Sequence, residues 1–250
     1  MPPAIAISER AAILRSRPDG FGRLARLYRW LEYLSFGPWL TLCRNARLRH
    51  PSVAAARHAL ILGDGDGRFL TRLLRWNPDL RALSIDGSHG MLARQRQRAA
   101  EKGVIPRLTT RCQEIRSFQP SGRYDLITTH FLLDCLSTAE VEALASRMRP
   151  CLAVGPGRNP AQNPVWIVSE FAIPSGIAQL PSRFIVRGLY LAFGLMTGLR
   201  ARSLPDHGGA LHRAGFFLRD RRTWLAGLLV SEVWATQDSS PRSHPSWTSR

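Results

Sequence analysis

One segment constrains the fold more than any other: residues 59–69 read Ala-Leu-Ile-Leu-Gly-Asp-Gly-Asp-Gly-Arg-Phe. Its apolar start is typical of a buried strand, and it runs directly into three alternate glycines, Gly63, Gly65 and Gly67. Alternate glycines allow a tight turn and let a ligand approach the backbone, because no Cβ atom stands in the way. The segment therefore predicts a strand, a ligand-binding turn and a helix, in that order.

Strands and helices alternate through the middle of the chain at a spacing typical of right-handed βαβ units. Such units build a parallel sheet with helices on both faces. Near the end of the chain, two neighbouring strands suit an antiparallel hairpin at one sheet edge. We therefore expect an α/β fold with a doubly wound, mostly parallel sheet. The expected strands are Ala59–Leu62, Leu80–Ile85, Arg107–Arg111, Tyr124–Thr128, Val165–Phe171, Phe216–Trp224 and Leu225–Ala235, and the expected helices are Arg68–Trp76, Ser88–Lys102, Thr138–Leu152 with an N-cap at Ser137, and Pro205–Ala214.

Changes in pattern along the chain predict its division into parts. Residues 1–50 carry apolar side chains at helical spacing before the first strand, and we expect them to form an N-terminal helical cap. Residues 51–236 are expected to form the α/β domain, with the helical segment 175–214 inserted as a lid. Residues 237–250 are rich in Ser, Pro and Arg and are expected to be disordered.

The charge balance is strongly basic, with 35 Lys and Arg residues against 18 Asp and Glu residues and a formal net charge of +17. Only Lys102 is a lysine, so a Schiff-base or general-base lysine elsewhere in the chain is excluded. A charge this high can mark nucleic-acid binding. The arginines, however, are scattered along the whole chain, which indicates a solvated basic surface. We therefore expect no specific nucleic-acid partner.

Cysteine spacing and hydropathy argue against other classes of protein. The four cysteines form no CxxC pair and no histidine cluster accompanies them, so we expect neither a metal site nor a disulfide framework. No stretch approaches the ~18 uninterrupted apolar residues of a membrane span, and the N-terminus lacks the apolar run of a signal peptide. These features predict a cytoplasmic protein without a membrane span.

The glycine turn also indicates the kind of ligand. A dinucleotide-binding fingerprint would be Gly-x-Gly-x-x-Gly, but Arg68 stands where its third glycine belongs. Asp64 and Asp66 inside the turn would repel a pyrophosphate, and they suit a ligand with cationic groups. Asp86 ends the second strand 19 residues beyond Gly67, a spacing at which a carboxylate accepts hydrogen bonds from ribose hydroxyls. We therefore expect a cationic ligand with a ribose, and not NAD.

Together these motifs resemble those of the class I S-adenosylmethionine-dependent methyltransferases. Residues 60–67 are similar to the cofactor loop of that family, and residues 86–88 are similar to its ribose-binding motif. Residues 112–115 fall where the family often carries an acidic residue for the adenine amino group, and residues 124–127 resemble its fourth strand. The resemblance implies a seven-stranded sheet whose last strand is antiparallel, with the cofactor across the carboxyl ends of the strands.

The resemblance also implies which residues bind S-adenosylmethionine. The adenine role falls to Glu114, with Gln113 as its rival. Many members carry an acidic residue at the position of Ile61, so Asp64 or Asp66 would have to serve the methionine ammonium in this chain. The implied cofactor-binding residues are Gly63, Asp64, Gly65, Asp66, Gly67, Asp86, Gly87, Gln113, Glu114 and Thr129.

Three residues are candidates for a catalytic base facing the active-site cleft: His130 and Asp134 after the fourth strand, and Glu170 at the end of the fifth. Methyl transfer from a sulfonium needs a base only when the acceptor must lose a proton. A structural role is the alternative for each candidate, since His130 can pack beside Phe131 and the two carboxylates can cap neighbouring segments. No metal ligand is expected among them.

The resemblance implies methyl transfer to a small molecule by in-line displacement, and the apolar stripes of the expected lid favour an apolar or aromatic acceptor. One alternative is a nucleic-acid (RNA) methyltransferase. Residues 128–131 read Thr-Thr-His-Phe, however, in place of the Asn/Asp-Pro-Pro-aromatic tetrapeptide usual in enzymes that methylate amino groups of nucleic acids. A cofactor-binding domain without catalysis is the other alternative. The sequence does not determine the acceptor atom or the oligomeric state.

Overall fold

A computed structural model describes residues 38–152, 163–172 and 204–236 of the chain. The chain divides into two compact units, Met1–Leu40 and Thr41–Arg250, and the fold described here is that of the second. Three expectations fall wholly or mostly outside the described residues: the N-terminal helical cap, most of the lid segment and the disordered tail.

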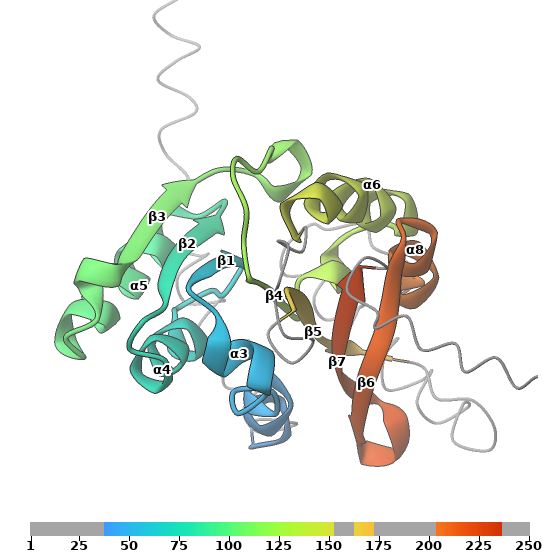
Figure 1. The fold of residues 1–250 in the computed structure, drawn as a ribbon, viewed down its shortest axis with the longest axis horizontal. Coiled ribbons are helices and arrows are strands. Elements are labelled where there is room, and N and C mark those ends of the chain that lie inside the picture. Colours follow the sequence, from blue (N-terminus) through green and yellow to red (C-terminus); the bar gives the residue numbers. More distant parts are fainter. Residues whose placement is uncertain (1–37, 153–162, 173–203, 237–250) are drawn as a thin grey trace, which may run out of the picture. The chain divides into compact units, whose positions relative to one another are not determined.

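The second unit is built on a seven-stranded sheet with the strand order β3-β2-β1-β4-β5-β7-β6 (Figure 1). Strands β1 to β5 pair in parallel, whereas β7 runs antiparallel to both β5 and β6. This confirms the doubly wound, mostly parallel sheet and its antiparallel hairpin at one edge. The strands are β1 (His58–Leu62), β2 (Arg81–Asp86), β3 (Leu108–Cys112), β4 (Leu126–His130), β5 (Val165–Phe171), β6 (Phe216–Trp224) and β7 (Leu229–Thr236).

Helices cover both faces of the sheet, because alternate residues of each buried strand point to opposite sides. Leu60 and Leu62 of β1 share one apolar cluster with α6 and α8, whereas Ala59 and Ile61 share another with α3, α4 and α5 (Figure 1). The strand order reverses between β1 and β4, and in such sheets ligands bind at the carboxyl ends of the strands near that point. The helices are α3 (Pro51–Ala55), α4 (Arg68–Trp76), α5 (His89–Glu101), α6 (Thr138–Met148) and α8 (His207–Arg213).

Helix α6 begins as its sequence predicts but ends earlier. Ser137 accepts a hydrogen bond from the Glu140 N–H, and the Glu140 carboxylate accepts one from the Ser137 N–H, which forms a capping box. The expected helix continued to residue 152, whereas the α-helix stops at Met148 and the 3-10 segment Arg149–Leu152 follows. Pro150 explains the change, because its ring nitrogen cannot donate the hydrogen bond that an α-helix requires.

Other differences from the expectation concern β7, α3 and β4. Strand β7 begins at Leu229 and not at residue 225, because residues 225–227 turn the chain with positive φ angles of 51°, 53° and 94°. The short helix α3 was not expected, although Pro51 at its first position is a recognised start signal. Strand β4 runs from Leu126 to His130, two residues later than expected, so His130 is its last residue and does not follow it.

Because β4 starts late, Asp125 lies just before this strand. There it connects the beginning of β1 to the beginning of β5. Its Oδ2 atom accepts hydrogen bonds from the backbone N–H groups of Arg57, at 2.8 Å, and His58, at 3.0 Å. The Asp125 backbone also bonds to His58 and to Val165 at the start of β5. Asp125 therefore fixes the register of β1, β4 and β5 at the edge opposite the carboxyl ends.

We predict that Asp125→Ala lowers the free energy of unfolding by about 1–3 kcal/mol, since it leaves two part-buried backbone donors without an acceptor. The matched control is Asp79→Ala, which removes an exposed carboxylate 3.3 Å from the Arg57 guanidinium. That loss should stay within about 0.5 kcal/mol, because exposed ion pairs contribute little. Urea denaturation measures both variants, and equal losses would contradict the assigned role of Asp125.

Candidate functional site

The turn between β1 and α4 has the backbone that its glycines predict. Gly63, Gly65 and Gly67 all lie in the left-handed region, with φ angles of 64°, 58° and 78°. A Cβ atom at Gly63 would lie 2.7 Å from Leu132, and one at Gly67 would lie 2.9 Å from Gln95. At Gly65 no described atom comes within 4 Å of that position. Gly63 and Gly67 therefore serve packing, and Gly65 borders open space that a ligand can occupy.

The second group of predicted residues meets this turn at the carboxyl end of β2. The Asp86 carboxylate accepts a hydrogen bond from the backbone N–H group of Ser88 at 2.9 Å, and the nearby backbone N–H group of Gly65 favours its ionised form. Burial raises the pKa of Asp86, and the nearby Glu114 carboxylate raises it further. Glu114 Oε1 lies 2.9 Å from the position of a Cβ atom at Gly87. The structure thus brings Gly65, Asp86, Gly87 and Glu114 together.

Of the two residues predicted to bind adenine, Glu114 is the one whose side chain lies beside Gly87. The Gln113 backbone N–H donates to the Asp86 carbonyl oxygen at 3.1 Å, which extends the pairing of β2 and β3 beyond the strands. That bond holds the chain so that the following residue reaches Gly87.

The two aspartates of the turn have different surroundings. Asp66 Oδ2 lies 3.0 Å from Arg68 Nε and 3.1 Å from Arg98 Nη2, so its charge is already balanced by two guanidinium groups. Asp64 is buried and accepts a hydrogen bond from the Leu70 N–H at 2.9 Å. Burial raises the pKa of Asp64 to about 7. A cationic ligand group beside Asp64 would favour its ionised form.

At the end of β4, Thr129 and His130 point into protein. Thr129 Oγ1 accepts a hydrogen bond from the Trp166 indole at 3.0 Å, so any contact of Thr129 with a cofactor falls to its backbone. The His130 ring packs edge-to-face on Phe69, with ring centroids 4.2 Å apart. Neither ring nitrogen of His130 has a hydrogen-bond partner among the described residues. Burial lowers the pKa of His130 well below its usual value, which keeps the imidazole neutral.

Glu170 and Asp134 lie beside the turn that follows β4. Glu170 is fully buried near the end of β5, and its Oε1 atom accepts hydrogen bonds from the N–H groups of Leu132, at 3.0 Å, and Leu133, at 2.9 Å. Burial raises the pKa of Glu170 well above its usual value, and the Asp134 charge adds to this effect. Asp134 itself is half-buried in the 3-10 segment Leu133–Cys135. Glu170 therefore orders the turn that carries Asp134.

Arg44 is a residue at this edge that the sequence analysis missed. Its guanidinium carbon lies 5.5 Å from the centre of the Phe131 ring, and Phe131 directly follows β4. The neighbouring Cys43 is fixed to the sheet, since its thiol donates to the Val230 carbonyl at 3.1 Å and its carbonyl accepts from Ser169 at 3.3 Å. Arg44 Nε is buried without a hydrogen-bond partner among the described residues.

The charge of Arg44 acts on two of the predicted site residues. It lowers the pKa of His130 and opposes the rise in the pKa of Asp64. Within the described residues the Arg44 guanidinium forms no ion pair with a carboxylate, which leaves a positive charge available to an anionic ligand group. No local pattern distinguishes Arg44 in the sequence, because it stands among several arginines in a segment before the first strand.

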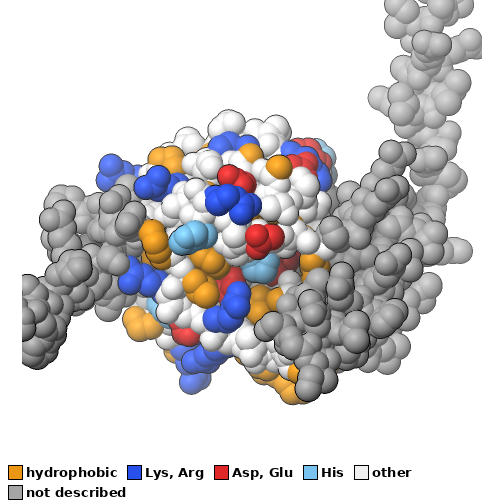
Figure 2. All heavy atoms as spheres, turned by 90° about the vertical axis from the view of Figure 1, so that its right-hand side faces the viewer, with side chains coloured by type: hydrophobic (Ala, Val, Ile, Leu, Met, Phe, Trp, Pro, Cys, Tyr) orange, Lys and Arg blue, Asp and Glu red, His pale blue; other side chains and the backbone are white. Residues whose placement is uncertain are grey.

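The structure also bears on the expectations about surface charge, cysteines, metal sites and membrane spans. Figure 2 shows basic side chains scattered over the face in view and interspersed with acidic and apolar ones. Cys43, Cys112, Cys135 and Cys151 are free thiols. In the described ranges no group of three or more His, Cys, Asp or Glu side chains could hold a metal ion. None of the helices in those ranges is both long and apolar enough to cross a membrane.

Comparisons with known proteins agree with this geometry. Residues 59–155 match the family model described as a methyltransferase domain. No curated protein matches the chain significantly in sequence.

Solved structures of methyltransferases share the fold. The S-adenosylmethionine-dependent methyltransferase SibL is 21% identical, with a TM-score of 0.62 over 88% of this chain and 63% of its own. An O-methyltransferase family protein from Burkholderia thailandensis is 17% identical, with a TM-score of 0.61 over 90% and 66%. An O-methyltransferase family 2 protein from Planctomyces limnophilus, in complex with apigenin, is 16% identical, with a TM-score of 0.56 over 72% and 51%.

The chain thus spans 63% and 66% of the length of the first two of these structures. At such identities the likeness concerns the fold, and the family match concerns residues 59–155. The strand order, the glycine turn and the acidic ends of β2 and β3 agree with both findings. Residues 59–155 thus match a methyltransferase domain, and the described part of the chain shares its fold with solved structures of S-adenosylmethionine-dependent methyltransferases.

Proposed function

We propose that the protein transfers a methyl group from S-adenosylmethionine to a small aromatic acceptor. The observation that carries this proposal is the open space at Gly65, bordered by the Asp86 carboxylate and by Glu114 at Gly87. The sulfonium of S-adenosylmethionine supplies an activated methyl group, so the protein has to orient the two reactants and exclude water.

The residues at the carboxyl edge of the sheet fit the parts of this cofactor. Asp86 would accept hydrogen bonds from the ribose hydroxyls, and Glu114 would accept one from the adenine amino group. Asp64 is the better of the two candidates for the methionine ammonium, because Asp66 is already paired with two arginines. Arg44 would bind the methionine carboxylate, which explains why an arginine without a carboxylate partner lies at this edge.

Two findings support an aromatic acceptor. The rings of Phe131 and Phe171, which follow β4 and end β5, lie 5.3 Å apart and give this end of the sheet an aromatic surface. Aromatic rings pack well against such a surface. Two of the similar structures are named as O-methyltransferase family proteins, and one of them was solved with the flavonoid apigenin. A phenolic hydroxyl is therefore the acceptor group that we propose.

A phenol must lose its proton during transfer, and Asp134 is the best of the three candidate bases. Glu170 is fully buried, which raises its pKa, and its Oε1 atom already accepts two backbone hydrogen bonds that hold it against the turn. His130 is a neutral, buried ring whose pKa is too low for an effective base. Asp134 is half-buried and lies on the turn that Glu170 orders. His130 would instead help to shape the site through its contact with Phe69.

Gly65→Val should abolish binding of S-adenosylhomocysteine, the demethylated cofactor, because the added side chain fills the open space beside the turn. The matched control is Gly103→Val, since Gly103 has a similar φ angle of 68° and equally open surroundings. Both variants carry the same backbone strain of roughly 1–2 kcal/mol. Calorimetric titration should show binding by Gly103→Val alone, and retained binding by Gly65→Val would contradict the site.

Arg44→Met should weaken S-adenosylhomocysteine about tenfold to a hundredfold, as expected when a charge-assisted hydrogen bond is lost. It should leave the affinity for 5′-methylthioadenosine, which lacks the amino-acid carboxylate, within about twofold. Arg81→Met, at an exposed arginine of β2, is the control. Equal weakening of both ligands would mean that Arg44 maintains the fold of the turn and does not bind the carboxylate.

Asp134→Asn should lower kcat for a phenolic acceptor about a hundredfold or more while the affinity for S-adenosylhomocysteine stays unchanged. The residual rate should rise with pH towards the pKa of the phenol, because the variant can use only an acceptor that is already ionised. The assay follows methylated product from a panel of phenols, apigenin included, with Asp79→Asn as control. A wild-type pH profile in the variant would remove Asp134 as the base, and no transfer to any phenol would refute the acceptor class.

A further inference from the structure

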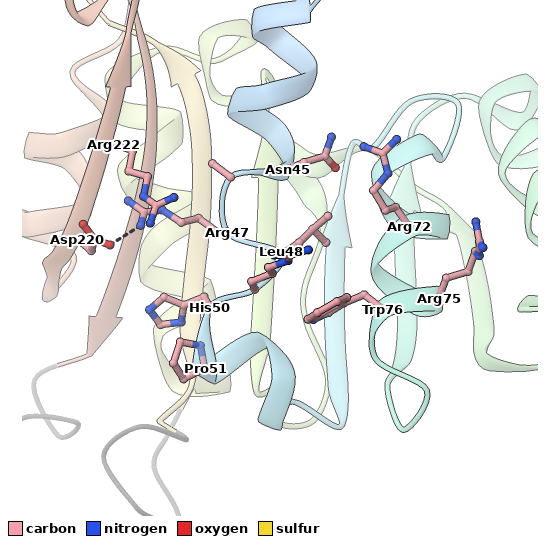
Figure 3. A pocket seen from close by; sticks show the side chains of 12 residues that line it. Asn45, Arg47, Leu48, His50, Pro51, Arg72, Arg75, Trp76, Asp220 and Arg222 are labelled. Atoms are coloured by element: carbon pink, nitrogen blue, oxygen red, sulfur yellow. Dashed lines mark hydrogen bonds and ion pairs between the residues drawn. The ribbon is translucent and has the colours of Figure 1, made fainter.

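A second concave surface lies between helix α4 and strand β6, with residues 45–51 as its floor (Figure 3). Its cavity volume is about 790 Å³, within the range of small-ligand pockets. We call it the arginine groove. None of the residues that we assign to the cofactor or to catalysis lines it. The lining residues are Asn45, Ala46, Arg47, Leu48, Arg49, His50, Pro51, Arg72, Arg75, Trp76, Asp220 and Arg222.

One arginine of the groove has a structural role. Arg47 is almost fully buried, forms an ion pair with Asp220 of β6, and donates to the Ser231 carbonyl of β7 at 2.9 Å. These contacts attach the floor of the groove to the edge hairpin. Asp220 is the carboxylate among the lining residues, and its main partner is Arg47. The hydrogen bond from the Arg47 side chain lowers the pKa of Asp220.

The other four arginines, Arg49, Arg72, Arg75 and Arg222, are exposed and form no ion pair with any described carboxylate. Several arginines elsewhere on the surface do have such partners, as in the pair of Arg213 with Glu142 at 2.8 Å. Asp220 feels the charge of Arg222 as well as that of Arg47, so a single carboxylate faces five arginines from three separate segments of the chain, and the groove carries an excess of positive charge. Like charges so arranged repel one another unless an anion lies between them.

Figure 3 shows how these side chains are placed. Arg222 lies beside Arg47 on the β6 wall, and Arg72 extends from α4 on the opposite wall, whereas Arg75 points away from the floor. A ligand lying along the floor would thus meet Arg222 from one side and Arg72 from the other. Guanidinium groups bind phosphate oxygens through paired N–H donors, which makes phosphate the anion that such an arrangement fits.

An aromatic surface lies next to this charge. Trp76 at the end of α4 is 47% exposed, and the Arg49 guanidinium carbon lies 5.5 Å from the centre of its ring. Figure 3 shows the Trp76 ring directed towards Leu48 on the floor. An exposed indole beside guanidinium groups suits a planar ring that carries phosphates.

We propose that the arginine groove binds a small phosphate ester with a planar ring, of the chemical class of nucleoside diphosphates. The phosphates lie between Arg72 and Arg222, and the ring packs against Trp76. This site is separate from the proposed cofactor site and does not depend on the proposed methyl transfer. A single pocket of this volume holds one such molecule, which favours a small ligand over a polymer that needs an extended basic stripe.

The test is calorimetric titration of the full chain with UDP and with pyrophosphate at about 0.15 M salt, where diffuse surface attraction is largely screened. UDP is the nucleotide used, because an adenosine group could also enter the cofactor site. Wild-type protein should bind one equivalent of each probe. Arg72→Gln/Arg222→Gln should weaken both at least about tenfold, and Trp76→Leu should weaken UDP more than pyrophosphate.

The matched control is Arg81→Gln/Arg94→Gln, which removes the same charge from two exposed arginines outside the groove. It should bind both probes within about twofold of wild type, since screened surface charges at a distance contribute little. Equal weakening in the control would overturn the proposal, as would the absence of saturable binding by wild type. Tight binding of an RNA oligonucleotide without binding of UDP would also overturn it and indicate a nucleic-acid surface.

Each variant is also titrated with S-adenosylhomocysteine. Unchanged affinity in the groove variants shows that they are folded and that the two sites are separate. Failure of wild type to bind S-adenosylhomocysteine would count against the proposed function alone, because the groove shares no residue with the cofactor site.

Discussion

The Asp86 carboxylate joins the two turns on which the candidate site depends, because it accepts a hydrogen bond from the Ser88 N–H group and its charge is favoured by the nearby Gly65 N–H group. One turn leaves β1 and the other leaves β2, and both lie at the carboxyl edge of the sheet. The glycine turn lies close to β2, since the Gly63 N–H donates to the Ile85 carbonyl oxygen at 2.9 Å, and the left-handed backbone of its three glycines allows this approach. A ligand beside Gly65 therefore meets a carboxylate whose position is already fixed.

Buried groups in the glycine turn and at the ends of β4 and β5 give this edge its electrostatic character. Asp64, Glu170 and His130 are all shifted towards their neutral forms by burial. Arg44 thus retains a positive charge near carboxyl groups that only weakly balance it. Buried polar atoms without partners, such as those of His130 and Arg44 Nε, are costly and are common where a ligand completes the hydrogen bonding. The edge is therefore suited to a ligand that carries both an ammonium and a carboxylate.

Arginine has at least three different roles in this chain. The sequence does not distinguish them, because arginines occur along the whole chain. Arg47 is buried and joins the segment before β1 to the edge hairpin through Asp220 and Ser231. Arg98 and Arg68 balance the charge of Asp66 within the glycine turn. The exposed arginines of the groove have no carboxylate partner among the described residues, so only their position between α4 and β6 distinguishes them from a solvated surface.

The sequence by itself determined the local elements and the chemistry of single segments. The strand, glycine turn and helix of residues 58–76 follow from apolar spacing and glycine conformation, and the capping box of α6 follows from Ser137 and Glu140 three residues apart. The alternation of strands and helices also determined the fold class, because parallel strands need crossover helices. These features depend on neighbours in the chain, whose sterics and hydrogen bonds act whatever the rest of the molecule does.

Only the tertiary structure decided which of the candidate residues face one another. Asp66 is paired because α5 brings Arg98 beside it, and Thr129 is turned away from the edge because Trp166 of the next strand binds its hydroxyl. Burial lowered the pKa of His130 and raised that of Glu170, and the attachment of Cys43 to β5 and β7 placed the neighbouring Arg44 at this edge. Pairing and burial depend on segments tens of residues apart in the chain, and a local pattern carries no information about which distant side chain will lie opposite.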